Sequence, residues 1–142
     1  MSAKTTADLI VEQIADALIF SDKNGSIRRW NAAAETMFGF TAEEALTQSL
    51  DIIIPEHLRA AHWRGFEAAM SNRTTRLEGR PTITRALHKL GHKLYVEMSF
   101  AIVIDDTGEV QGSAAIARDV TERIEKERTI KSQTRPQDSQ AS

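Results

Sequence analysis

The sequence predicts an α+β fold, in which an antiparallel sheet of five strands carries helices on one face. Near the N-terminus, an Asn-Gly pair separates two short apolar stretches, which is a frequent signal for a β-hairpin. Several helical patterns follow, and then three longer apolar stretches joined by short turns, which is typical of an antiparallel meander. Because the helices fall between the two groups of strands, we expect them to gather on one face of the sheet.

The composition is that of one globular domain. The chain has 142 residues, of which 41% are hydrophobic and 27% are charged, and its formal net charge is −2. This charge gives no reason to expect nucleic acid or an anionic membrane as a partner. The absence of cysteine excludes disulfides and thiolate metal sites, and no apolar run reaches the roughly 20 residues of a membrane span. We therefore expect a cytoplasmic protein.

The N-terminal region, residues 1–16, is expected to form an amphipathic helix that leads into the domain. Its apolar residues recur at near-helical spacing, with polar and acidic residues between them. The predicted domain, residues 17–118, then opens with a hairpin of two strands at residues 17–21 and 26–30. Asn31 follows directly, and since Asn is a favoured N-cap, a short helix should begin here.

Two further helices are expected before the sheet resumes. Thr41 and Glu44 are spaced as a capping box, which predicts a short helix directly after Thr41. A longer helix is predicted for residues 56–71, because Pro55 suits a first helical turn and the acidic residue after it favours the positive end of the helix dipole.

Three strands should complete the sheet, at residues 76–87, 93–104 and 110–117. The second of them alternates well, and its apolar residues share one face: Leu94, Val96, Met98, Phe100 and Ile102. Beyond the domain we expect a charged helix at residues 119–131. Residues 132–142 are polar and lack apolar anchors, so they are interpreted as a disordered tail.

The order of these motifs resembles that of PAS domains. DALIFSDKNGSIRRWNAAAETMFGFTAEEAL is similar to the first half of a PAS domain, a strand pair with a tight turn followed by the WNAAAETMFGF segment. GHKLYVEMSFAIVIDDTGEVQGSAAIARDVTERIEKER resembles the last two PAS strands and the Asp-Val-Thr motif that transfers the signal. The resemblance covers about residues 7–128. It implies a PAS fold flanked by N-terminal and C-terminal signalling helices, with a role as a sensor in signal transduction.

The middle of the chain resembles a narrower group. IIPEHLRAAHWRGFEAAM and the following RLEG are similar to the haem-binding PAS domains of bacterial oxygen sensors, both the direct oxygen sensor phosphodiesterases and the rhizobial oxygen-sensor kinases. In both groups a histidine of this helix is the proximal ligand of the haem iron, and His62 holds that position. The resemblance implies haem b as cofactor and a diatomic gas, O₂, CO or NO, as ligand.

The residues themselves leave two interpretations of His62 open. Helical spacing places Leu58, His62, Gly65, Phe66 and Ala69 on one apolar face that should point toward the sheet. Burying the imidazole unpaired would cost on the order of 1–3 kcal/mol. It is therefore either a core histidine bonded to a backbone carbonyl or, as the resemblance implies, a neutral ligand of haem iron.

The apolar face of the helix and the facing side of the sheet are expected to form the walls of a pocket. The cofactor-binding candidates besides His62 are Leu58, Phe66, Leu77, Met98, Phe100 and Ile116, together with Ile52, Ile53 and Ile102 as further apolar wall. Arg76 is interpreted either as a partner of a haem propionate or as a surface charge.

The distal side departs from the family pattern. Arg80 occupies the position at which the phosphodiesterase sensors carry a methionine, the sixth ligand of the haem iron. Thr82 occupies the position at which these families carry an arginine that contacts the bound gas. The distal gas-contact candidates are Arg80, Thr82 and Met98. Arg80 is either a hydrogen-bond donor to O₂ or a solvated strand residue, and Met98 is either a sixth ligand or, as its alternation favours, a core residue.

Other functions remain open beside gas sensing. The chain could be a haem-free PAS module for dimerisation or interaction, or a sensor of another small ligand such as noncovalent flavin, although the missing cysteine excludes a flavin adduct of the LOV type. Trp30 and Asn31 are candidate flavin contacts, but a core role and a cap role are favoured for them. No catalytic motif is present, so an enzyme is not expected. The expected partners are a second copy of the chain and a histidine kinase of a two-component system or another effector.

Overall fold

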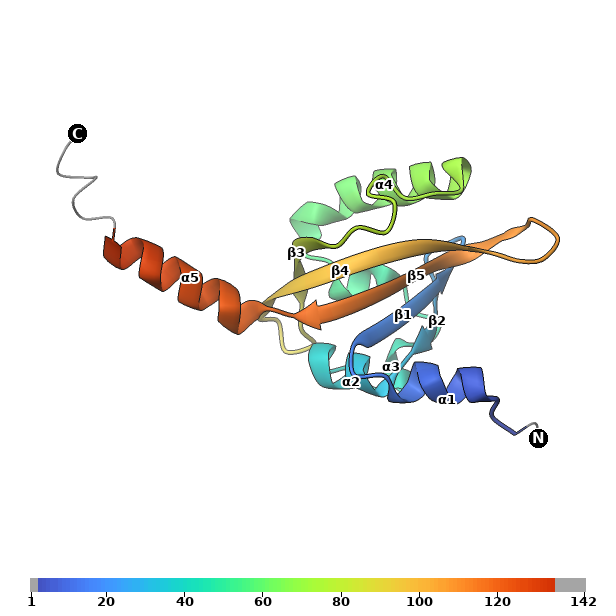
Figure 1. The fold of residues 1–142 in the computed structure, drawn as a ribbon, viewed down its shortest axis with the longest axis horizontal. Coiled ribbons are helices and arrows are strands. Elements are labelled where there is room, and N and C mark those ends of the chain that lie inside the picture. The colour runs from blue at the N-terminus through green and yellow to red at the C-terminus, as the bar shows by residue number, and fades with distance from the viewer. Residues whose placement is uncertain (1–2, 135–142) are drawn as a thin grey trace.

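The computed structural model of the chain describes residues 3–134 (Figure 1). Its elements in chain order are α1 (Thr6–Gln13), β1 (Ala17–Asp22), β2 (Ile27–Trp30), α2 (Ala32–Phe38), α3 (Ala42–Ala45), the 3₁₀ turns η1 (Leu50–Ile53) and η2 (Glu56–Leu58), α4 (Arg59–Asn72), β3 (Thr82–Leu87), β4 (Lys93–Ile104), β5 (Val110–Asp119) and α5 (Thr121–Thr134). The strands form one antiparallel sheet in the order β2-β1-β5-β4-β3. The predicted α+β fold with a five-stranded antiparallel sheet is confirmed.

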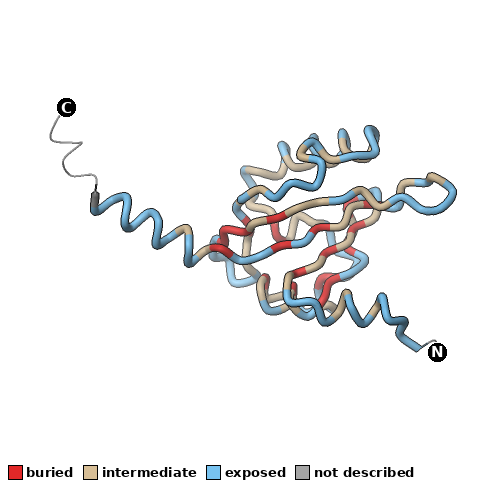
Figure 2. Tube along the Cα trace, in the orientation of Figure 1, coloured by how far each residue is buried: buried red, intermediate tan, exposed pale blue. Residues whose placement is uncertain are grey.

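The hydrophobic core lies between the central strands and the short helices of the first half. Its largest fully buried apolar side chains are Phe38 of α2, Ile19 of β1, Ile27 of β2 and Val96 of β4. Figure 2 shows that the buried stretches follow the strands, whereas α4 carries none. The long helix of the middle region therefore lies beside the packed core and not within it.

The predicted helix caps are confirmed. The Asn31 side-chain oxygen accepts a hydrogen bond of 3.0 Å from the Ala34 amide, as an N-cap should, and α2 ends at Gly39 in the left-handed region with φ of 84°. Thr41 and Glu44 form the reciprocal capping box at the start of α3. These caps depend on residues three positions apart, so the local sequence is sufficient to specify them.

The prediction of a strand from residue 76 was wrong for its first six residues, because β3 begins at Thr82. Residues 75–80 form a turn instead, in which the Glu78 amide donates to the Thr75 carbonyl oxygen at 3.1 Å. Glu78 and Gly79 have φ values of 52° and 82°, which a strand cannot accommodate. The predicted helix at 56–71 is likewise divided into η2 and α4.

Helices flank the sheet at both ends of the chain. The N-terminal one is α1, which has no buried residue and leaves Leu9, Ile10 and Ile14 exposed. At the other end, α5 extends away from the sheet (Figure 1) and continues to Thr134, so residues 132–134 of the predicted tail are helical. Residues 135–142 of that tail lie outside the described residues. Within the described part of the chain, every helix is too short or too polar to cross a membrane.

Candidate functional site

A cavity of about 430 Å³ lies between α4 and the inner face of the sheet. Its wall is formed by α4, by the 3₁₀ turns before it, and by inward-facing residues of β1, β3, β4 and β5, and most of this wall is apolar. Cavities of roughly 300–1,000 Å³ with apolar walls and a few polar groups are typical of small-molecule and cofactor sites. This cavity is therefore the candidate binding site.

One end of α4 is anchored beside the cavity by three contacts. The Trp63 indole N–H donates a hydrogen bond of 2.8 Å to the Asp51 carboxylate, and the Arg59 guanidinium donates one of 3.0 Å to the Ile54 carbonyl oxygen. The Trp63 ring also lies against Gly25 in the β1–β2 turn, where a Cβ atom would come within 2.2 Å of the ring. These contacts hold the helix above the sheet, while its apolar face borders the cavity.

His62 lies on this apolar face of α4 and lines the cavity. Its ring packs against Trp63 and Phe66, with centroid distances of 4.6 and 6.0 Å. The ring nitrogen Nδ1 is buried and has no hydrogen-bond partner among the described residues, so the bond to a backbone carbonyl considered above is not made. Burial lowers the pKa of His62 below its ordinary value of 6.5, against a smaller opposing effect of the Asp51 carboxylate. Burial thus favours the neutral form of the imidazole.

The cavity exists partly because β5 presents small side chains to it. Ala115 lies between Phe100 of β4 and Ile19 of β1 in the strand register, and Ser113 lies between Ile102 and Ser21. All six of these residues line the cavity. A row of larger residues on β5 would fill this space, so the alternation of β5 determines whether a ligand can enter.

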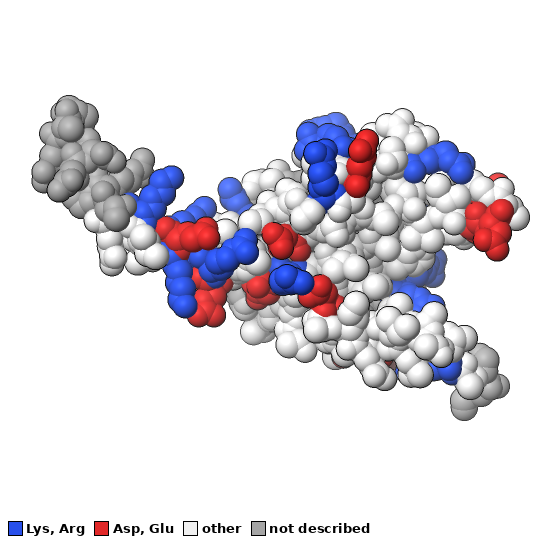
Figure 3. Space-filling model, in the orientation of Figure 1, with Lys and Arg blue, Asp and Glu red and all other residues white. Residues whose placement is uncertain are grey.

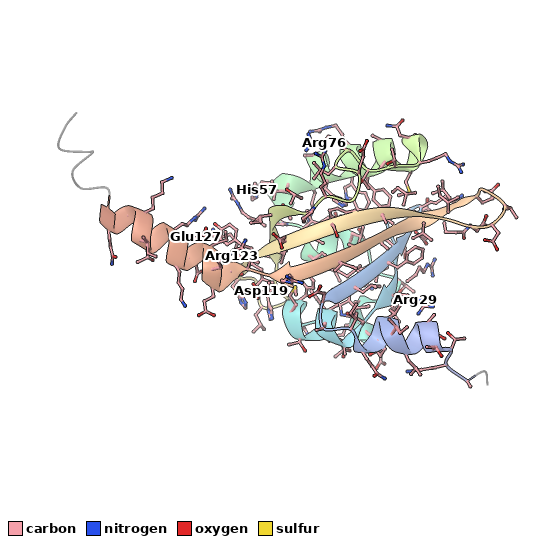
Figure 4. All side chains as sticks on the ribbon, viewed as in Figure 1. Arg29, His57, Arg76, Asp119, Arg123 and Glu127 are labelled. Atoms are coloured by element: carbon pink, nitrogen blue, oxygen red, sulfur yellow. The ribbon has the colours of Figure 1, made fainter. Side chains whose placement is uncertain are left out.

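Most of the predicted site residues meet at this cavity. Those that line it are Leu58, His62, Phe66, Arg76, Thr82, Met98 and Phe100, and the wall candidates Ile53 and Ile102 do so as well. Figure 3 shows basic side chains over the segment between α4 and β3, where Figure 4 labels Arg76. The cavity therefore combines an apolar interior with a positive charge at its edge.

The placement of Ile116 in the pocket was wrong. Ile116 is 39% exposed and lies on the opposite face of the sheet, beside Ser99 and Arg118. Its neighbours Ala115 and Ala117 point inward because β5 pairs with β1 in the register Ala17↔Ala117. Since side chains alternate along a strand, this register directs Ile116 outward.

The placements of Leu77 and Arg80 were also wrong, because both belong to the turn before β3. Neither residue lines the cavity, and Arg80 is exposed, with its Nε–H donating 2.9 Å to the Leu77 carbonyl oxygen. Arg80 therefore lies outside the cavity wall. Ile52, another wall candidate, packs against the core and not on the cavity.

Several polar residues of the cavity wall were not predicted from the sequence, chiefly Ser21, Ser113 and Thr84. The inward orientation of Ser21 could have been predicted from strand alternation. Ala17 and Ile19 are apolar inward positions of β1, and Ser21 is the next position on the same face. The candidate flavin contacts have structural roles. The Trp30 indole donates to the Phe40 carbonyl oxygen at 2.9 Å, and the Asn31 amide donates to the Val11 and Asp16 carbonyl oxygens.

Comparison with known proteins places this architecture in a family. The family model described as the PAS fold matches residues 7–120, which is most of the chain. The chain belongs to the PAS family. It is accordingly a PAS sensor domain, and PAS domains are typically non-catalytic modules of signalling proteins.

The PAS domain is similar to parts of two curated bacterial sensors. It is 26% identical over 119 residues to the Escherichia coli oxygen sensor protein DosP, covering 84% of the chain, and 40% identical over 53 residues to the Bradyrhizobium diazoefficiens sensor protein FixL, covering 37% of the chain. The matched regions make up 15% and 10% of those proteins. The similarity therefore concerns one domain of each longer protein.

Solved structures with low sequence identity share the fold. A PAS domain from Colwellia psychrerythraea superposes with a TM-score of 0.72 at 23% identity, covering 82% of this chain and 95% of that one. An RNA-binding light-oxygen-voltage receptor superposes with a TM-score of 0.69 at 21% identity, covering 90% and 36%. At these identities the likeness establishes the fold alone.

Proposed function

We propose that this PAS domain is a haem-based sensor of a diatomic gas, in which His62 is the proximal ligand of the haem iron. The observation that carries the proposal is His62, which lines a 430 Å³ cavity and whose buried Nδ1 atom has no partner among the described residues. A buried polar atom without a partner is costly, so a ligand that occupies the cavity would explain why a histidine is tolerated there.

The donor set of the cavity fits haem. Burial lowers the pKa of His62 and so favours the neutral imidazole, which is the form that ligates a metal. Residues 3–134 contain no group of three His, Asp or Glu side chains that could hold a metal ion by themselves. A metal bound at His62 would thus need most of its donors from a macrocycle. When bound, haem b supplies an iron atom that takes up O₂, CO or NO.

The remaining walls suit a flat, largely apolar cofactor with carboxylate groups. The cavity has apolar side chains on both its helical and its sheet side. They are Leu58 and Phe66 of η2 and α4, and Met98 and Phe100 of β4. Arg76 borders the same cavity and is exposed, so its guanidinium is available to pair with a propionate. The similarity to the oxygen sensor protein DosP and to the sensor protein FixL also supports a gas-sensing function.

The signal is proposed to leave the cavity through the sheet. Met98 and Phe100 are on β4, and β4 also contacts the start of α5 through Tyr95. A displacement of β4 on gas binding would thus reach the exit helix. We propose that the domain works in the cytoplasm as a homodimer and acts on a histidine kinase of a two-component system or on another effector.

The test is the absorption spectrum of the protein purified with haem supplied. The wild type and His57→Ala should show a Soret band, since His57 is exposed and outside the cavity, whereas His62→Ala should lose it or show it strongly shifted. A colourless wild type would overturn the proposal in favour of a haem-free interaction module. An unchanged band in His62→Ala would remove His62 as the ligand.

A further inference from the structure

A second residue of the same cavity wall, Ser21, also carries a buried polar atom that has no partner among the described residues. The hydroxyl group of Ser21 is buried and makes no hydrogen bond within the described residues, and the whole residue is 1% exposed. Ser21 lies on β1, whereas His62 lies on α4, so the two unpartnered atoms belong to different walls. A buried hydroxyl without a partner is uncommon in folded proteins and needs a physical explanation.

A hydroxyl group is unexpected at the position that Ser21 occupies in the sheet. The inward positions before it on β1 are Ala17 and Ile19, which pack in the core. Across the strand pair, Ser21 is paired with Ser113 of β5, which also lines the cavity. The sheet therefore presents two adjacent hydroxyl side chains where an apolar pair would continue the core.

Among the described polar residues of the cavity wall, Ser21 is the only one that is fully buried. Thr82 and Ser113 are only partly buried, so their hydroxyl groups can exchange hydrogen bonds with water. Arg80, which the sequence suggested as a donor, is exposed and lies outside the cavity. Ser21 alone among these residues is fully buried and unpartnered.

We propose that the Ser21 hydroxyl donates a hydrogen bond to the gas molecule in the cavity and so favours O₂ over CO. This inference rests on the proposed function. If haem were bound, a hydroxyl donor at this position would favour O₂, the gas ligand that accepts a hydrogen bond well, and would add little for CO. Ser21 would thereby take the role of the arginine that this chain replaces with Thr82.

The experiment compares haem-loaded wild type, Ser21→Ala and the control Ser99→Ala, with dissociation constants for O₂ and CO measured by optical titration. Ser99 lies on β4 but lines the opposite face of the sheet, so it controls for loss of a strand serine. Loss of one hydrogen bond should weaken O₂ binding by roughly three- to tenfold in Ser21→Ala. CO binding should change less than about twofold, and Ser99→Ala should change neither.

Thermal unfolding of the haem-free proteins gives a readout that needs no gas. Ser21→Ala removes a hydroxyl that has no partner, so its Tm should equal or exceed that of the wild type. A lower Tm would mean that the hydroxyl is bonded within the protein, and that result would overturn the inference.

The outcomes distinguish a failure of the Ser21 inference from a failure of the proposed haem-based function. A wild type that binds no haem overturns the proposed function, and this inference with it. A haem-bearing Ser21→Ala variant with an unchanged ratio of O₂ to CO affinity overturns this inference alone.

Discussion

The backbone amide of Tyr95 on β4 donates a hydrogen bond of 2.9 Å to the side-chain oxygen of Thr121, the first residue of α5. The Val120 amide donates to the Tyr95 carbonyl oxygen, also at 2.9 Å, and the Arg128 guanidinium lies 5.0 Å from the centre of the Tyr95 ring. Asp119, labelled in Figure 4, accepts from the Thr121 amide. Together these contacts join the strand that borders the cavity to the helix that leaves the domain.

Replacement of Thr121 by valine should loosen this junction. The partly buried Tyr95 amide would lose its acceptor, at a cost of about 1–2 kcal/mol in the free energy of unfolding. Hydrogen exchange should become faster at the start of α5, while haem binding should be retained because Thr121 is remote from the cavity wall. Thr129→Val is the matched control, since the Thr129 hydroxyl bonds only within α5. Equal exchange in both variants would contradict a linking role for Thr121.

Gly25→Ala should displace Trp63 and weaken the anchor of α4. Gly25 has φ of 81°, and a Cβ there would lie 2.2 Å from the Trp63 ring. Gly91→Ala is the control, because Gly91 has φ of 95° but a Cβ there would meet nothing within 4 Å. Urea unfolding should show about 1 kcal/mol lost in Gly91→Ala from backbone strain, and about 1–3 kcal/mol more in Gly25→Ala from overpacking. Similar losses in the two variants would mean that the Trp63 contact is unimportant.

The haem-free protein should lose stability as the pH falls below about 6.5. Burial lowers the pKa of His62 and of His88 in the folded state, and for His88 the charge of His92 adds to this effect. Below the unfolded pKa of about 6.5 the unfolded chain binds protons that the folded chain does not, so unfolding is favoured progressively until the folded pKa is passed. The effect is absent above pH 7.

Urea midpoints measured from pH 8 to pH 5 test this dependence. His62→Gln should flatten the profile in part between pH 7 and pH 6, and adding His88→Gln should flatten it further. A midpoint that stays constant down to pH 5 in the wild type would contradict burial of neutral His62.

Gly65→Ala should stabilise the empty protein and impair its loading. A Cβ on Gly65 would meet nothing within 4 Å, and alanine favours a helix over glycine by about 0.5–1 kcal/mol. Gly65 nevertheless lines the cavity, so the added methyl group would occupy ligand space. We expect higher stability without haem and a smaller bound fraction in a haem titration. Glu67→Ala, on an exposed position of α4 outside the cavity, should leave haem binding unchanged. Equal haem binding in Gly65→Ala would exclude this face from the site.

Local sequence predicted the elements well where local contacts form them. Asn31 caps α2 through the Ala34 amide, and Thr41 with Glu44 caps α3, because each cap needs only residues within one helical turn. The apolar face of α4 was predicted correctly from helical spacing, since His62 and Phe66 line one cavity, and Leu58 of η2 lines it as well.

The errors concern positions whose surroundings come from distant parts of the chain. Residues 76–81 are compatible with a strand in composition, but the turn at Glu78 and Gly79 delays pairing with β4 until Thr82. Ile116 is the bulkiest residue of its segment and was expected inside. Only the pairing of β5 with β1 and β4 determines that Ala115 and Ala117 take the inner face.

The sequence by itself determined the PAS fold, the order of its elements and the histidine on the apolar face of α4, because periodicity, caps and motifs are carried by neighbouring residues. The tertiary structure decided what that histidine faces. Small residues of β5 and the anchored end of α4 leave a cavity, and the strand register places Ser21 on its wall, with a hydroxyl that has no partner within residues 3–134. These features depend on long-range pairing and on the volume left between packed elements, which no local pattern specifies.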